Sequence, residues 1–168
     1  ALDFDDSHFR AFEHVSAFVV PTALTVGEWL GKPGRKIILA SVAGYEVACR
    51  IGLARLRDRA FLHDPSMGAI ENKPIYPTGA LFACAVEASK LMGLGVDQMT
   101  AAMGFAGSLG LFVMQTHREK AQAMPFNNGW ACYAGVIAAM VAETGLRGPE
   151  HIFEGDRGYF KAFAAYYP

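Results

Sequence analysis

The sequence has little charge and few cysteines, and each shortage excludes a class of protein. Charged residues make up 18% of the 168 residues, and the formal net charge is −1. A near-neutral chain gives no electrostatic reason to expect nucleic acid as a partner. Cys49, Cys84 and Cys132 lie in apolar stretches without CxxC spacing. This pattern is typical of reduced thiols inside the cell and not of a disulfide framework, so we expect a cytoplasmic protein.

The sequence also lacks a long hydrophobic run of the kind that spans a membrane. Its richest uncharged stretch, residues 98–117, is interrupted by glycines and a serine, and the apolar part covers only residues 101–114. A spanning helix needs about 20 apolar residues, so we expect no membrane association. Apolar residues nevertheless make up 52% of the chain, which excludes a disordered protein. We expect one domain with a real core over residues 1–168.

Apolar residues recur at helical spacing, and no alternating strand pattern of useful length is present. We therefore expect an all-α fold, a helical bundle built from helix–turn–helix hairpins. A glycine stop followed by a short turn recurs at Gly31, Gly93 and Gly145, and Asp97 and Pro149 suit the start of the next helix. The expected helices lie near residues 21–31, 36–58, 79–92, 97–115, 129–144 and 158–166.

Two of these helices carry predictions about packing. In the helix over residues 36–58, Glu46 is placed to pair with Arg50 one turn later on the exposed face. The segment over residues 130–142 is apolar nearly all round, which is typical of a helix in the middle of a bundle. The residues expected on the buried face of the helix over 36–58 are Ile38, Val42, Tyr45, Cys49, Leu53 and Leu56.

An acidic segment near the N-terminus is the first candidate for chemistry. It contains Asp3, Asp5 and Asp6, followed by His8 and His14. Three carboxylates in four residues repel one another unless cations or a helix N-terminus compensate. The segment is either a solvated turn or a site where a carboxylate orients a histidine as general base. A metal site is a third alternative, although the spacing fits neither a calcium loop nor a zinc motif.

Two further polar segments each precede an expected helix. Residues 73–79 (KPIYPTG) offer backbone amides and the Thr78 hydroxyl, which suit a carboxylate or phosphate at a helix N-terminus. Residues 125–129 (PFNNG) form an expected amide-rich loop before Trp130. Each segment is also compatible with a helix start that has no further role.

These segments together resemble the MmgE/PrpD family, and the resemblance runs from one end of the chain to the other. Members of this family include 2-methylcitrate dehydratase, cis-aconitate decarboxylase and iminodisuccinate epimerase. The segments that carry the resemblance are residues 1–7 (ALDFDDS) and 14–16 (HVS) with Pro21, 42–48 (VAGYEVA), 76–79 (YPTG), 129–131 (GWA) with Gly135, and 152–155 (IFEG) with 158–160 (GYF).

The resemblance implies cofactor-independent chemistry without a metal. A proton is taken from, or returned to, the carbon beside a carboxylate of a small di- or tricarboxylate. Asp3, Ser7 and His14 match family positions, which implies that His14 is the base and Asp3 orients it. Tyr76 stands in place of a histidine of the family, Met124 in place of a lysine, and Asn127 in place of another histidine. The implied catalytic residues are His14, Asp3 and Tyr76, and the implied substrate contacts are Ser7, Thr78, Met124 and Asn127.

Two functions remain open at this point. The first is a lyase or isomerase (a hydro-lyase, decarboxylase or epimerase) that acts on a small polycarboxylate. The second is a catalytically degenerate helical subunit that serves assembly or ligand binding. Met124 favours this second function, because its uncharged side chain cannot replace a lysine that binds a substrate carboxylate. The family has a smaller α/β domain after the helical one, so the resemblance implies a fragment or a split subunit. We expect a homo-oligomer or a second complementing chain, with residues 109–114 buried against it.

Overall fold

The computed structural model describes residues 5–55, 75–76, 79–109, 112–113, 119 and 123–163. The expected all-α fold is confirmed, apart from one antiparallel pair of two-residue strands that joins Ile75 to Val113 and Tyr76 to Phe112. The elements in chain order are α1 (Ser16–Trp29), α2 (Gly34–Arg55), β1 (Ile75–Tyr76), α4 (Ala80–Met92), α5 (Val96–Leu109), β2 (Phe112–Val113), α7 (Ala123–Glu143) and α8 (Tyr159–Phe163).

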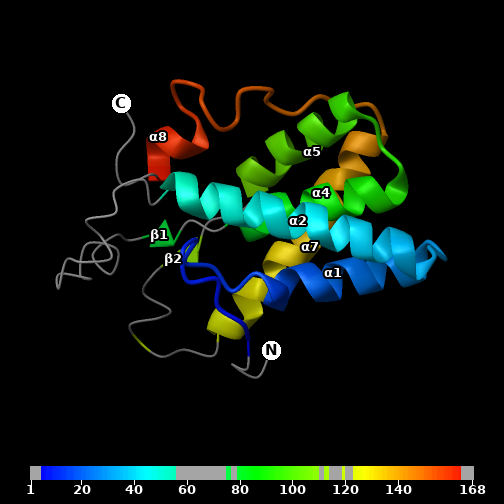
Figure 1. Ribbon diagram of the computed structural model, residues 1–168. Helices are drawn as coiled ribbons and strands as arrows, with labels where there is room; N and C mark the ends of the chain where they lie inside the picture. Colours follow the sequence, from blue (N-terminus) through cyan, green and yellow to red (C-terminus); the bar gives the residue numbers. More distant parts are fainter. Residues whose placement is uncertain are drawn as a thin grey trace.

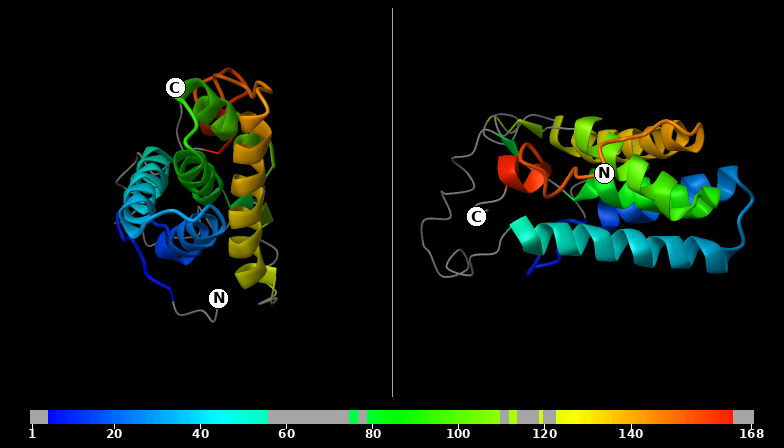
Figure 2. Two further views of the ribbon diagram at one scale, coloured as in Figure 1. Left: turned by 90° about the vertical axis from the view of Figure 1, so that its right-hand side faces the viewer. Right: turned by 90° about the horizontal axis from the view of Figure 1, so that it is seen from above.

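Helix α4 occupies the middle of the bundle. It contacts α1, α2, α5 and α7, and Figure 1 and Figure 2 show these helices arranged around it. Every residue of α4 from Ala80 to Ser89 is buried. The prediction that residues 130–142 form the central helix is therefore wrong. Helix α7 lies at the outside of the bundle, and its Trp130 and Tyr133 are exposed.

The three predicted glycine stops are confirmed, because each glycine has a left-handed backbone that a side chain disfavours. The φ angles are 59° at Gly31, 83° at Gly93 and 88° at Gly145. The first two turns connect helices as expected. The third does not, because residues 146–158 form turns and irregular structure before α8 begins. In this stretch the backbone of Pro149 lies against Gly104 of α5.

Two helices begin earlier than expected, and both contain a proline close to the predicted start. Helix α1 begins at Ser16 and includes Pro21, which the sequence analysis placed at the first turn. Helix α7 begins at Ala123, so Pro125 lies in its first turn, where a missing amide costs no intrahelical bond. Asn127 therefore lies on a helix and not in the expected loop.

The buried face of α2 differs from the predicted one. Cys49 is buried as predicted, and Leu56 lies outside the described residues. Ile38, Val42 and Leu53 are exposed, whereas Gly44 and Ala48 face the core. A Cβ at Gly44 would lie 2.5 Å from Cγ of Glu87, so α2 approaches α4 through its smallest residues. The predicted surface pair on this helix is confirmed, since Nε of Arg50 lies 2.7 Å from Oε1 of Glu46.

One helix in the described part of the chain, from Gly34 to Ala54, is long and apolar enough to cross a membrane by length and composition. A single helix of this kind is weak evidence, because core helices of soluble bundles pass the same test. This helix packs against α1 and α4 along one face, whereas Ile38, Val42 and Leu53 on its other side are exposed. This helix lies outside residues 98–117, the richest uncharged stretch of the sequence. Cytoplasmic location and the absence of membrane association stay predictions.

Candidate functional site

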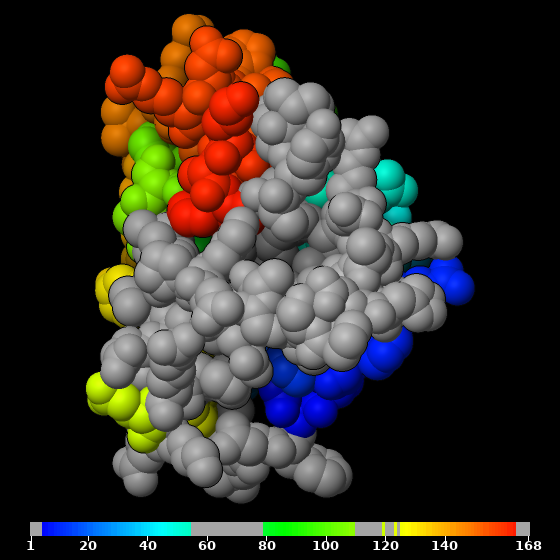
Figure 3. Space-filling view, turned by 90° about the vertical axis from the view of Figure 1, so that its left-hand side faces the viewer, coloured from blue at the N-terminus to red at the C-terminus, as the bar shows by residue number. Residues whose placement is uncertain are grey.

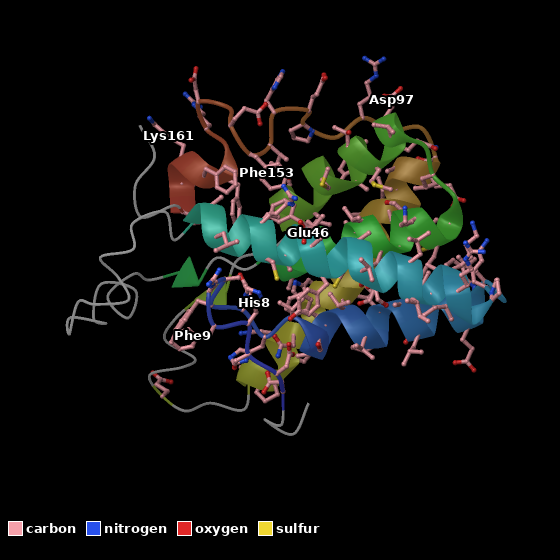
Figure 4. All side chains as sticks on the ribbon, in the orientation of Figure 1. His8, Phe9, Glu46, Asp97, Phe153 and Lys161 are labelled. Atoms are coloured by element: carbon pink, nitrogen blue, oxygen red, sulfur yellow. The ribbon has the colours of Figure 1, made fainter. Side chains whose placement is uncertain are left out.

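The acidic segment before α1 folds into a tight turn. The backbone amide of His8 donates to the carbonyl of Glu13 at 2.8 Å, and the amide of Phe12 donates to the carbonyl of His8 at 2.9 Å. Phe12 has a φ of 53°, which is uncommon for a residue with a side chain. Figure 4 shows His8 and Phe9 on this turn, and the ring of His8 lies 6.1 Å from the ring of Tyr45 on α2. The turn places His14 immediately before the start of α1.

The two histidines of the turn have opposite hydrogen-bonding roles. Nδ1 of His8 accepts a hydrogen bond from the backbone amide of Ala11 at 3.0 Å, so it holds the turn together. Nδ1 of His14 lies 2.8 Å from the backbone carbonyl oxygen of Asp6. A carbonyl oxygen only accepts, so Nδ1 of His14 carries the hydrogen and donates it. In the neutral ring the lone pair then lies on Nε2, which is the form that a general base needs.

Two more polar groups lie close to the His14 ring. The Oγ atom of Ser7 is 3.2 Å from Nδ1, and Oδ2 of Asp5 is 3.7 Å from the same nitrogen. The His14 side chain is 51% exposed, so a small molecule in solution can reach the ring. An imidazolium formed after proton abstraction would have the Asp5 carboxylate beside it. Two predicted site residues, Ser7 and His14, therefore lie side by side. Asp3, which was expected to orient His14, lies outside the described residues.

The carboxylate of Asp6 is held by the start of α1. Its Oδ1 accepts a hydrogen bond from the backbone amide of Ser16 at 2.8 Å. A helix N-terminus has unpaired amides and a positive end of the helix dipole, so it compensates part of the repulsion among the acidic side chains. The pKa of Tyr45 is raised, first by burial and then by the charges of Cys49 and Asp6. The pKa of Cys49 is raised for the same first reason and by nearby Glu46, Glu13 and Asp6.

Glu13 links the turn to the segment that contains Tyr76 and Thr78. Its side chain is buried, and Oε1 accepts a hydrogen bond from the backbone amide of Gly79 at 3.1 Å. Two of the three predicted site segments therefore meet directly. Tyr76 lies on β1, but its side chain and all of Thr78 lie outside the described residues.

The third predicted segment lies at the beginning of α7. Met124 and Asn127 are in its first two turns, and Asn127 is partly buried. The described contacts of His14 go to Asp5, Asp6 and Ser7, and none of these residues belongs to α7. Figure 3 views this end of the molecule, with the N-terminal turn and the start of α7 on opposite sides of it. A common cavity for His14, Tyr76 and Asn127 stays a prediction, and the side chain of Met124 is not described.

Sequence reasoning missed the roles of Asp6 and Glu13. Asp6 positions His14 through its main chain and the start of α1 through its side chain, and Glu13 fixes the turn before α4. The local sequence offers little signal for either role, because a backbone carbonyl is independent of residue type and Gly79 is far away in sequence. Among the residues that the structure describes, no group of three or more His, Cys, Asp or Glu side chains is placed to hold a metal ion. The absence of a metal and of any cofactor stays a prediction.

Comparison with known proteins supports the resemblance seen in the sequence. The chain is 27% identical over 165 residues to a cis-aconitate decarboxylase from Aspergillus terreus. It is 25% identical over 167 residues to a cis-aconitate decarboxylase-like protein from Aspergillus oryzae. Each alignment covers 95% of this chain, which spans about a third of the length of these curated relatives. The sequence model of the MmgE/PrpD N-terminal domain family matches residues 1–168, and the chain therefore belongs to that family.

Proposed function

We propose that this domain takes part in cofactor-independent lyase or isomerase chemistry on a small di- or tricarboxylate, with a cis-aconitate-like tricarboxylate as the first candidate. The names of the two Aspergillus relatives support the substrate class. The observation that carries the proposal is the fixed tautomer of His14, whose Nδ1 donates to the Asp6 carbonyl. This contact directs the basic lone pair to Nε2, at a position that small solutes can reach.

In the proposed mechanism, Nε2 of His14 takes the proton from the carbon beside a substrate carboxylate. The Asp6 carbonyl keeps the ring oriented, and the Asp5 carboxylate lies 3.7 Å from Nδ1 of the same ring. The Ser7 hydroxyl lies 3.2 Å from the ring and is placed to contact a substrate oxygen. Return of the proton to the same carbon gives an isomerase, whereas loss of a neighbouring group gives a lyase.

Binding of the substrate carboxylates needs donors besides Ser7. The resemblance assigns this role to Tyr76, Thr78 and Asn127, which offer hydroxyl and amide donors. Met124 offers no hydrogen-bond donor for a carboxylate. Binding of a substrate carboxylate at this position is therefore weaker than it would be with a lysine. We therefore propose a substrate that relies on neutral donors from this domain.

Hydrogen exchange at the substrate carbon tests this proposal without requiring a complete reaction. The purified protein is incubated with cis-aconitate, citrate and related polycarboxylates in deuterium oxide, and proton NMR follows exchange beside each carboxylate. His14→Asn keeps a side-chain N–H that can reach the Asp6 carbonyl but removes the base. We expect it to slow exchange by about a hundredfold or more. His151→Asn is the control, because His151 is exposed and pairs with Glu154 away from this turn.

Circular dichroism on both variants shows whether the fold survives. Equal exchange rates for the parent and a folded His14→Asn protein would overturn the role of His14. Saturable binding of a polycarboxylate to the parent, with neither exchange nor product, would instead support the degenerate, ligand-binding subunit.

A further inference from the structure

Two cysteines lie where α4 and α7 approach each other most closely. A Cβ at Gly135 of α7 would lie 2.5 Å from Cβ of Cys84 on α4 and 2.8 Å from the backbone nitrogen of Ala85. The glycine therefore lets the two helix backbones come together at Cys84. Cys132 precedes Gly135 by three residues, which places it on the same face of α7, one turn earlier.

Both sulfur atoms contact the same backbone oxygen of α1. Sγ of Cys84 lies 3.8 Å from the carbonyl oxygen of Phe18, and Sγ of Cys132 lies 3.5 Å from it. The Thr22 hydroxyl donates to Sγ of Cys84 at 3.3 Å, so three helices enclose the pair. The shared acceptor and the hydrogen bond between the two thiols place their sulfur atoms next to each other, as a disulfide between the two helices requires. Both residues are free thiols in this structure.

The two thiols differ in protonation and in access. Burial and then the hydrogen bond with Cys132 raise the pKa of the Cys84 thiol, whereas the same hydrogen bond lowers the pKa of Cys132. Cys132 is partly exposed and therefore available to a small oxidant, whereas Cys84 is shielded from solvent. Burial raises the pKa of nearby Glu87 to about 10, so this carboxyl is neutral at pH 7 and does not repel a Cys132 thiolate.

We propose that Cys132 and Cys84 form a peroxide-reactive dithiol site, in which Cys132 is oxidised first and Cys84 closes a disulfide between α7 and α4. The Cys132 thiolate attacks one oxygen of hydrogen peroxide. An S–O bond forms, the O–O bond breaks, and the hydroxide that leaves takes a proton from solvent. The Cys132 side chain is then a sulfenic acid.

The second step uses the buried thiol. The sulfur of Cys84 attacks Sγ of Cys132, an S–S bond forms, and the S–O bond breaks. The departing hydroxyl leaves as water with the proton from the Cys84 thiol. Together the two sulfurs lose two electrons, and one peroxide is reduced to two water molecules. The disulfide would fasten the outer helix α7, which carries Asn127, to the central helix α4.

Thiol counting after peroxide treatment tests this site directly. The fully reduced protein is treated with one equivalent of hydrogen peroxide, quenched with N-ethylmaleimide under denaturing conditions, and analysed by intact mass and non-reducing peptide mapping. The parent should fall from three alkylated cysteines to one, with Cys84 and Cys132 in one linked peptide pair. Cys49→Ser should give the same link, because Cys49 takes no part.

The single variants separate the two roles. Cys84→Ser should stop at the sulfenic acid of Cys132, which dimedone traps, and Cys132→Ser should leave both remaining thiols unoxidised. A parent that keeps three reactive thiols would overturn the proposal. So would a link through Cys49, or a parent in which Cys132 is over-oxidised while Cys84 stays free. Because the parent protein alone decides these outcomes, poor folding of a variant does not prevent the test.

Discussion

Helices α4 and α7 are both rich in apolar residues, yet only α4 lies in the middle of the bundle. Helix α4 has alanine at positions 80, 83, 85 and 88, and it is contacted by glycines of two neighbours, Gly44 of α2 and Gly135 of α7. Helix α7 has large aromatic side chains on one face, where Trp130 is 42% exposed and Tyr133 is 58% exposed. Apolar composition alone therefore does not decide which helix is central.

Both helices bury alanines, Ala131 and Ala138 of α7 among them, so small residues mark the faces that pack closely and do not by themselves make a helix central. A central helix must accept neighbours on every side, and short side chains allow their backbones to approach. Helix α4 even buries the carboxyl of Glu87 with 0% exposure, and neither of its oxygens has a hydrogen-bond partner among the described residues. The position of α4 is therefore maintained by close packing despite a buried polar group that opposes it.

The largest expected effect comes from blocking the contact of α4 with α7. Gly135→Val adds a branched side chain where even a Cβ would lie 2.5 Å from Cys84. We expect the free energy of unfolding to fall by about 3 kcal/mol or more, because backbone and buried atoms must move apart. Gly129→Val on the same helix is the control, since no atom lies within 4 Å of its added Cβ. Urea unfolding measures both, and equal losses would contradict the close contact at Gly135.

The next effect concerns the polar group inside the central helix. Burial raises the pKa of Glu87 from 4.5 to about 10, so the native state keeps a proton that the unfolded state releases. Below pH 4.5 Glu87 is protonated in both states, so the free energy of unfolding does not depend on its titration. As the pH rises from 4.5 towards 10, the free energy of unfolding falls by at most about 1.4 kcal/mol per pH unit. Glu87→Met should remove this decline and stabilise the protein by about 2 kcal/mol at pH 7.

Urea unfolding of Glu87→Met and the parent across pH 5 to 8 checks this expectation. Glu46→Met serves as the control, because Glu46 is exposed and pairs with Arg50 one turn away. It should change stability by about 0.5 kcal/mol or less. Parallel pH profiles for the parent and Glu87→Met would mean that Glu87 is already solvated or paired in the native state.

The sequence was sufficient to predict the helical class and the turns but not the packing. Helical spacing and the glycines at 31, 93 and 145 are local signals, and all three glycines have the left-handed backbone expected. On α2, the buried Cys49 matches the predicted face, whereas the closest approach to α4 uses Gly44 and Ala48, which the spacing of large apolar residues did not indicate. A close approach depends on the partner helix, so no pattern within α2 alone reveals it.

For the candidate site, the sequence predicted which residues take part but not the contacts that hold them in place. The family motifs singled out His14 and Ser7, and the structure places their polar atoms 3.2 Å apart. The contacts that fix this arrangement come from the Asp6 backbone and from Glu13 across to Gly79. Main-chain contacts and contacts between distant segments leave no motif, so the sequence alone could not supply them.

A smaller effect is expected where a polar contact, and not packing, fixes a helix. Asp6→Ala removes the acceptor of the Ser16 amide at the start of α1 and should cost about 1 kcal/mol. Asp5→Ala is the matched control, because its carboxylate makes no such contact with the helix and lies 3.7 Å from His14. Urea unfolding at low salt compares the two variants. A larger loss for Asp5→Ala would show that the contact with His14 matters more to stability than the helix start.

The smallest effect on folding is expected at the exposed face of α7. Phe126, Trp130, Tyr133 and Met140 are exposed there at roughly helical spacing. Replacing Trp130 and Tyr133 together by serine removes side chains that face solvent, so the free energy of unfolding should change by about 0.5 kcal/mol or less. If a second copy or a complementing chain covers this face, the same variant should be a monomer in light scattering while the parent is larger. A marked loss of stability in a monomeric parent would instead show that these aromatic side chains pack within their own chain, and the contrast between α7 and α4 would disappear.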